Sequence, residues 1–146
     1  MKPVTPLCAC EVFVLNENEE VLLIERSDNQ TWALPGGCHD LNETPKECAE
    51  RECWEESGFK INVTDLIGVY SSNRYEYKYY PYKDNQFCHM LFKAEITGGS
   101  AKTSSETLRV GWFKQDQLPL LNDGHDFRIR HGFEFCRGRM KKPYFE

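Results

Sequence analysis

The sequence predicts a mixed α/β layered fold in a single domain, residues 1–146. Apolar, β-prone segments both precede and follow one strongly signalled helix, and a second helical pattern lies near the C-terminus. Strands on both sides of a helix, with another helix at the end, are typical of mixed α/β layers. A chain of 146 residues matches one domain, since domains commonly have roughly 100–200 residues.

The N-terminal part predicts short strands joined by polar turns. Residues 7–15 are mostly apolar and β-prone, and residues 21–24 form a second apolar run. The polar residues 16–19 between them predict a turn, so we expect the two strands to pair as a hairpin. A short extended segment at residues 32–35 is then ended by two consecutive glycines.

The central helix has start and stop signals at both ends. Thr44 is suited to the N-cap, Pro45 to the first helical position, and Glu47 completes a capping box. We expect the helix to run through Glu56. Gly58 follows where a left-handed C-terminal cap belongs.

The C-terminal half predicts further strands and a second helix. Residues 61–70, 87–96 and 108–113 have β-like composition. Spaced apolar residues predict a helix over residues 123–136. We expect the basic and aromatic residues 137–146 to be a frayed, solvated tail.

Charge and hydropathy exclude several classes of protein. The net charge of −5 argues against a sequence-independent nucleic-acid binder, which normally carries a basic patch. No run reaches the roughly 18 apolar residues of a membrane span. No small-residue cleavage site follows a hydrophobic core near the N-terminus. We therefore expect a cytoplasmic protein without a membrane segment and with nucleic acid an unlikely partner.

The cysteines predict neither a disulfide framework nor a zinc site. There are seven of them at irregular spacing, and none forms the C-x-x-C pair of common zinc sites. Free, buried cysteines in a reducing compartment fit this usage.

A cluster of acidic residues lies in and before the central helix. Residues 37–59 read GCHDLNETPKECAERECWEESGF. On a helix Glu52, Glu55 and Glu56 project from one face, where like charges repel. Mg²⁺ or Mn²⁺ would turn this repulsion into ligation, because hard cations favour carboxylate oxygens. Arg51, four residues before Glu55, would orient a carboxylate. For the three glutamates alone, a solvated charged face is the alternative.

The full segment resembles the Nudix box, G-x5-E-x7-R-E-U-x-E-E-x-G-U, in which U is aliphatic. Every charged and glycine position matches, and Cys53 is the single departure, at a position where the family usually has an aliphatic residue. The resemblance extends to an L-P-G-G entry at residues 34–37, a Trp-Phe pair at residues 112–113 and a Leu-Pro turn at residues 118–119.

The resemblance implies an α/β/α sandwich with a mixed sheet and a loop–helix–loop metal site. Family members hydrolyse a diphosphate linkage in nucleoside diphosphates that bear a variable group. Carried over by position, Glu52, Glu55 and Glu56 would be metal ligands, and the Gly37 carbonyl would be a further one. In some members the residue equivalent to Glu52 instead activates water. Arg51 would orient the glutamates.

Glu106 is an additional candidate for the metal site. It follows the loop at residues 98–105 and precedes Trp112 by six residues. Some Nudix members have a glutamate in this loop that binds another metal ion or acts as general base. The alternative is a solvated loop acid. Where relatives often have a second acid, this chain has Arg109.

Candidate substrate contacts lie outside the box. Tyr75 and Tyr77 belong to an aromatic segment and could stack on a nucleobase, or equally pack on the sheet or form a homodimer interface. Trp32 could line the pocket or pack in the core. Arg26, at the end of a strand, could reach a phosphate or ribose.

Three functions fit this sequence. The first is an Mg²⁺-dependent diphosphatase for a nucleoside diphosphate joined to another group, with ADP-ribose-like substrates first. The second is a nucleoside triphosphate pyrophosphohydrolase that sanitises the nucleotide pool. The third is a silent nucleotide-binding module, which the complete set of box glutamates disfavours.

Overall fold

The computed structural model describes residues 4–74 and 85–146, so the candidates Tyr75 and Tyr77 lie outside the described residues. Within these two ranges, two helices and two short 3-10 turns alternate with strands. The helical elements are α1 (Pro45–Ser57), η1 (Ser72–Arg74), η2 (Gln115–Gln117) and α2 (His125–Cys136). The strands are β1 (Leu7–Phe13), β2 (Val21–Arg26), β3 (Trp32–Ala33), β4 (Gly36–Cys38), β5 (Phe59–Ser71), β6 (Phe87–Gly99), β7 (Thr107–Phe113) and β8 (Tyr144–Phe145).

The strands form two sheets. The larger has the order β4-β1-β6-β5-β8 and the smaller has the order β3-β2-β7. In the larger sheet β1 pairs with β6 and β5 with β8 in parallel, whereas β4–β1 and β5–β6 are antiparallel. The predicted mixed sheet is therefore confirmed.

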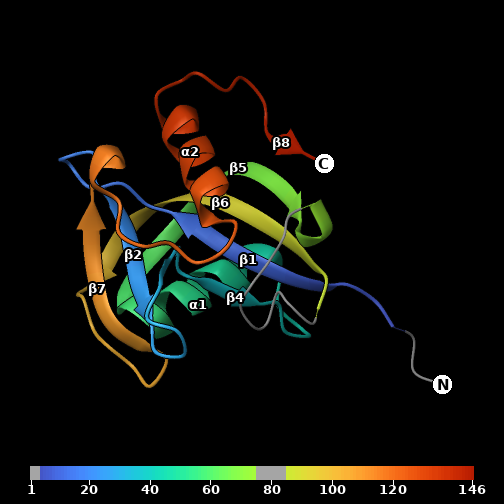
Figure 1. The fold of residues 1–146 in the computed structure, drawn as a ribbon, viewed down its shortest axis with the longest axis horizontal. Coiled ribbons are helices and arrows are strands. Elements are labelled where there is room, and N and C mark those ends of the chain that lie inside the picture. Colours follow the sequence, from blue (N-terminus) through green and yellow to red (C-terminus); the bar gives the residue numbers. More distant parts are fainter. Residues whose placement is uncertain (1–3, 75–84) are drawn as a thin grey trace.

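Helices cover both faces of the larger sheet. Figure 1 shows α1 and α2 on opposite sides of β1. Side chains alternate along β1: Val12 packs in the cluster that contains the α1 residues, and Phe13 packs with Phe133 of α2. This arrangement is the expected α/β/α sandwich.

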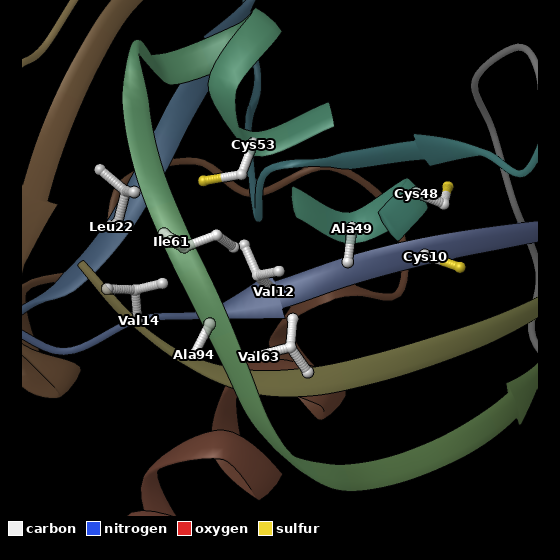
Figure 2. Packing of buried hydrophobic residues seen from close by; sticks show 10 residues of the cluster. All are labelled: Cys10, Val12, Val14, Leu22, Cys48, Ala49, Cys53, Ile61, Val63 and Ala94. Atoms are coloured by element: carbon white, nitrogen blue, oxygen red, sulfur yellow. The ribbon is translucent and has the colours of Figure 1, made fainter. Parts of the chain in front are cut away.

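Small side chains let α1 approach the sheet closely. Cys48, Ala49 and Cys53 are fully buried on its inner face. Figure 2 shows them in one cluster with Val12 of β1 and Ile61 of β5. Cys53, the departure from the box, thus occupies the buried position of an aliphatic residue and behaves as a small hydrophobe.

Local signals set the ends of α1 as predicted. The Thr44 hydroxyl accepts a hydrogen bond from the Glu47 amide at 3.1 Å, and the Glu47 carboxylate accepts one from the Thr44 amide at 3.0 Å. At the other end Gly58 has φ 82°, a left-handed conformation that favours glycine, and its amide donates to the Trp54 carbonyl. The capping prediction is confirmed.

The predicted hairpin of the first two strands is wrong. β1 pairs with β4 and β6 in the larger sheet, and β2 pairs with β3 and β7 in the smaller one. Beyond the end of β1, an isolated bridge joins Leu15 to Val21, and the Leu22 amide donates a hydrogen bond to the Val14 carbonyl at 3.0 Å. The turn therefore carries the chain from one sheet to the other, and β1 is left free to pair on both sides within a sheet that is covered on both faces.

The prediction that residues 137–146 form a frayed tail is also wrong. β8 adds to the edge of β5, and Tyr144 stacks on Tyr70 with ring centroids 5.2 Å apart. The Glu146 carboxylate accepts a hydrogen bond from the Ser71 amide at 3.0 Å. Aromatic packing therefore orders the end of the chain.

Two further expectations concern the whole chain. Within the described ranges no helix is long and apolar enough to cross a membrane. All seven cysteines lie in those ranges and are free thiols. Cys8 and Cys38 are exposed, so the expected burial is wrong for these two.

Candidate active site

Arg51 ties α1 to the loop that precedes it. Its Nε and Nη2 donate to both carboxylate oxygens of Glu43 at 2.9 and 2.8 Å. Its Nη1 donates to Glu52 at 2.9 Å and to Glu55 at 3.2 Å. Hydrogen bonds from Arg51 and from the Asp40 amide lower the pKa of Glu43 to about 2. Arg51 thus orients two of the box glutamates while its bidentate pair with Glu43 holds it in place.

Gly37 lies directly against Glu52. A Cβ built on Gly37 would be 2.5 Å from Glu52 Cδ, so only glycine allows this approach. Burial raises the pKa of Glu52, and the charges of Glu55 and Glu106 raise it further, whereas Arg51 acts in the opposite direction. Glu52 is therefore held close to the backbone among other acids.

Glu56 is anchored on the neighbouring glycine. The Gly36 amide donates to Glu56 Oε1 at 2.7 Å. Burial raises the pKa of Glu56 to about 8, against the effect of this hydrogen bond, and the charge of Glu52 contributes in the same direction as burial. The two consecutive glycines thus each contact one box glutamate.

A cavity of about 290 Å³ opens beside Glu56. It is lined by Arg26, Ser27, Asp28, Glu56 and Glu106. The Ser27 amide donates to the Glu106 carbonyl at 3.0 Å, which joins the end of β2 to the loop before β7. Arg26 Nη2 is paired with Asp28 at 2.6 Å. The fold thus brings Glu106 and Arg26, both predicted from sequence, to the box glutamates.

Trp32 lies in the core. It is 8% exposed and packs edge-on against Phe113, with ring centroids 4.9 Å apart. The Arg109 guanidinium lies over the Trp32 ring and also pairs with Glu25 at 2.8 Å. This packing favours the interpretation that Trp32 packs in the core over the one that it lines the pocket.

The NUDIX domain family model matches residues 7–133. The chain belongs to the Nudix family. The resemblance of residues 37–59 to the Nudix box is thereby confirmed.

Three relatives illustrate the range of this Nudix chain's similarities. A MutT-like protein of Streptomyces ambofaciens is 36% identical over 72% of this chain and 62% of its own length. A putative 8-oxo-dGTP diphosphatase of Bacillus subtilis is 38% identical over 75% of this chain and 68% of its own. An ADP-ribose pyrophosphatase of Methanocaldococcus jannaschii is 30% identical over 86% of this chain and 72% of its own length. The chain thus spans less than two thirds of the first of them.

A solved structure covers the entire Nudix chain. A UDP-X diphosphatase has a TM-score of 0.87 at 25% identity, over 100% of this chain and 70% of that one. The similarity extends the Nudix assignment from the box to the whole fold.

The donor set of this Nudix site fits a divalent cation. The charge of Glu106 contributes to the raised pKa of Glu52 and of Glu56, and the charge of Glu52 contributes to that of Glu56, a repulsion that a cation relieves. Carboxylate and carbonyl oxygens suit hard cations, and Nudix hydrolases use a divalent metal ion. In the described part of the chain no three acidic, histidine or cysteine side chains already surround one point.

Sequence reasoning missed several contributors to the site. Gly36 holds Glu56, and Asp28 holds Arg26. From sequence the two glycines predict only the end of an extended segment, although two adjacent glycines before an acidic helix also indicate a close backbone approach. No signal at Asp28 distinguishes it from an ordinary loop acid.

Proposed function

We propose that this protein hydrolyses the diphosphate of a nucleoside diphosphate joined to another group, with ADP-ribose-like compounds first. The observation that carries the proposal is the cavity in which Arg26 meets Glu56 and Glu106. It combines carboxylates for a cation with a guanidinium for a phosphate or ribose.

The chain's own residues supply the binding and orientation. Glu52, Glu55, Glu56, Glu106 and the Gly37 carbonyl would hold the cation, Mg²⁺ first and Mn²⁺ as a substitute. When bound, the cation neutralises charge on the diphosphate and makes water a stronger nucleophile. Arg51 orients Glu52 and Glu55, and the Gly36 amide fixes one oxygen of Glu56.

Arg26 and Glu106 would act on the substrate side. Arg26 is paired with Asp28 on the cavity wall, from which its guanidinium can turn to a phosphate. Glu106 lies on a loop anchored to Ser27, and it is our candidate for the base that takes a proton from water, with Glu52 the alternative.

The relatives support the substrate class. The archaeal relative hydrolyses ADP-ribose by its name, and the UDP-X diphosphatase likewise names a nucleoside diphosphate joined to a second group. The Bacillus relative favours the alternative of a triphosphate pyrophosphohydrolase. Tyr75 and Tyr77 remain our candidates for base stacking.

Location and partners are part of the proposal. Seven free thiols suit the reducing cytoplasm, and the net charge of −5 opposes nucleic-acid binding. We expect a small-molecule partner and allow a homodimer.

A product-resolved screen tests this function. Purified protein is incubated with Mg²⁺, or with EDTA as control, and ADP-ribose, CDP-choline, a nucleotide sugar, a dinucleoside polyphosphate or nucleoside triphosphates. Metal-dependent release of AMP and ribose 5-phosphate from ADP-ribose, with triphosphates poor, supports the proposal. Preferred release of pyrophosphate from triphosphates replaces it with the alternative. Nucleotide binding without turnover of any compound favours the silent module.

A further inference from the structure

A buried cluster of ionisable side chains lies where β1, β6 and α2 meet. Arg128 Nε is 2.8 Å from Glu11 Oε1, and His125 Nε2 is 3.0 Å from Glu11 Oε2. His89 Nδ1 completes the cluster at 3.6 Å from Glu11 Oε1. The side chains of these residues are at most 4% exposed.

The cluster carries one fixed pair of opposite charges. Although burial alone would raise the pKa of Glu11, the charge of Arg128 and the hydrogen bond with His125 keep it well below the usual range. Burial and the Arg128 charge lower the pKa of both histidines, that of His89 to about 3. Near neutral pH the cluster is therefore a Glu11–Arg128 ion pair flanked by two neutral imidazoles.

Glu11 lies beside β4, the strand whose glycines contact Glu52 and Glu56 of α1. It is the register partner of Gly36 in the β1–β4 pairing, and a Cβ on Gly36 would lie 2.8 Å from Glu11 Cγ. The amide of the same Gly36 donates to Glu56, and the next residue, Gly37, lies against Glu52. The glycine backbone is thus enclosed between Glu11 on one side and the two glutamates on the other.

Stability alone gives no reason for this cluster. Buried ion pairs can commonly be replaced by apolar residues of similar volume without loss of stability, and the neighbours of Glu11 in β1 are apolar. The helix α2 is already anchored by Ile129 and Phe133 in the core. Because Glu11 is paired directly with Gly36 of β4, a charged pair at this position points to a role in fixing the geometry of the site.

We propose that Glu11, held by Arg128 and His125, is a positioning residue that fixes the Gly36–Gly37 backbone and thereby the cation-binding geometry of Glu52 and Glu56. The inference rests on the proposed function only in taking these glutamates as cation ligands. It assigns α2, which lies on the opposite face from α1, a part in assembling the site.

The test uses an apolar replacement that keeps the fold. In Glu11→Leu/Arg128→Met both charges are removed together, so neither is left buried and unpaired. Single Glu11→Gln retains a hydrogen-bonding side chain beside Gly36 and serves as the conservative variant; because it leaves the Arg128 charge without its carboxylate, its binding is compared on folded protein. Tyr70→Phe is the matched control, because it breaks another contact between α2 and the sheet, the 2.7 Å hydrogen bond to His131, away from β4.

Binding of Mn²⁺ alone is measured by titration calorimetry, with circular dichroism and thermal unfolding to verify folding. We expect the folded double variant to bind Mn²⁺ about tenfold or more weakly, as found for residues that orient metal ligands. Glu11→Gln should lie between the double variant and wild type. Tyr70→Phe should lower the Tm but change the Kd less than twofold. On any substrate found, kcat of the double variant should fall at saturating Mn²⁺ with KM nearly unchanged.

The inference is overturned if the folded double variant binds Mn²⁺ as wild type does, or if Tyr70→Phe weakens binding equally. Wild-type protein that binds no Mn²⁺ also overturns it. Wild-type protein that binds Mn²⁺ but hydrolyses no diphosphate refutes the proposed function alone, since the change in Mn²⁺ affinity is measured without turnover.

Discussion

The box glutamates differ in their partners, although they share one helix. Glu55 pairs with Arg51 at the surface, Glu52 lies against Gly37, and Glu56 depends on the Gly36 amide. The box spacing predicts which acids share one face of the helix. It did not predict the contact of each glycine, because such contacts depend on how β4 packs against α1.

Replacing Glu56 with Gln should lower turnover by on the order of 10³-fold with little change in Tm, because it removes a cation-binding oxygen. Turnover of the best substrate at saturating Mg²⁺, measured for the variant and for wild type, tests this prediction. Glu50→Gln, on the same helix but outside the cluster, should retain nearly full activity. Near-wild-type turnover of the Glu56 variant would refute the metal assignment of α1.

Replacing Gly37 with Ala should disturb Glu52, because the new Cβ would lie 2.5 Å from Glu52 Cδ. We expect at least a tenfold loss in kcat in a folded protein. Gly98→Ala is a matched control, since the nearest atom to its Cβ is Lys60 Cδ at 4.0 Å. Equal rates in both variants would show that the close approach of Gly37 is irrelevant to activity.

Replacing Glu106 with Gln should lower kcat by about tenfold or more if this carboxylate binds the cation or takes a proton from water. Glu95→Gln, an exposed glutamate of β6, is the control. A change in kcat below about threefold would show that Glu106 is a solvated loop acid without a part in catalysis. The pH–rate profiles of wild type and variant separate the base from a ligand, because only loss of the base removes the acidic limb.

At the scale of elements, local sequence signals predict the ends of the helix α1 but not which strands pair with each other. Thr44, Glu47 and Gly58 define the ends of α1 within a few neighbouring residues, so the sequence reveals them. The partner of β1 is chosen by strands far along the chain, and its pairing with β6 could not be read from residues 7–24. For the same reason local sequence predicts a tail where β8 forms, because β8 depends on its contacts with Tyr70 and β5.

Replacing Thr44 with Ala should destabilise the protein by about 1 kcal/mol, the usual value of an N-cap hydroxyl. This corresponds to a fall in Tm of roughly 3 °C for a chain of this size. Thermal unfolding measures the change, and exposed Thr64→Ala provides the baseline for a threonine outside a cap. A fall in kcat at a temperature where the variant is still fully folded would indicate that the start of α1 also shapes the site.

At the scale of the molecule, the larger sheet is buried on both faces, so the sequence predicts its strands but not which helix each strand contacts. Apolar residues of β1 read simply as a strand, whichever helix they contact. Glu11 is the single acid in that apolar run of residues 7–15, but its partner Arg128 is 117 residues away. Only the folded chain shows that α2, β1 and the glycines of β4 form one connected group.

The buried histidines make global stability depend on pH. His89 has a folded pKa of about 3 against an ordinary value of 6.5, because it is buried and faces Arg128 as well as Glu11 and His125. The unfolded chain therefore binds more protons than the folded one below pH 6.5, and stability falls as the pH falls. Glu56, whose pKa is raised to about 8, acts in the opposite direction, because the folded chain keeps its proton longer.

Comparison with His89→Leu isolates the histidine, since both proteins carry Glu56. As the pH falls from 6.5 to 5, we expect wild type to lose about 1 kcal/mol per pH unit relative to the variant. Urea unfolding at several pH values, without divalent cation, measures this difference in the free energy of unfolding. Parallel curves for the two proteins would mean that His89 is protonated equally in the folded and unfolded chains, and that the cluster around Glu11 is open to solvent.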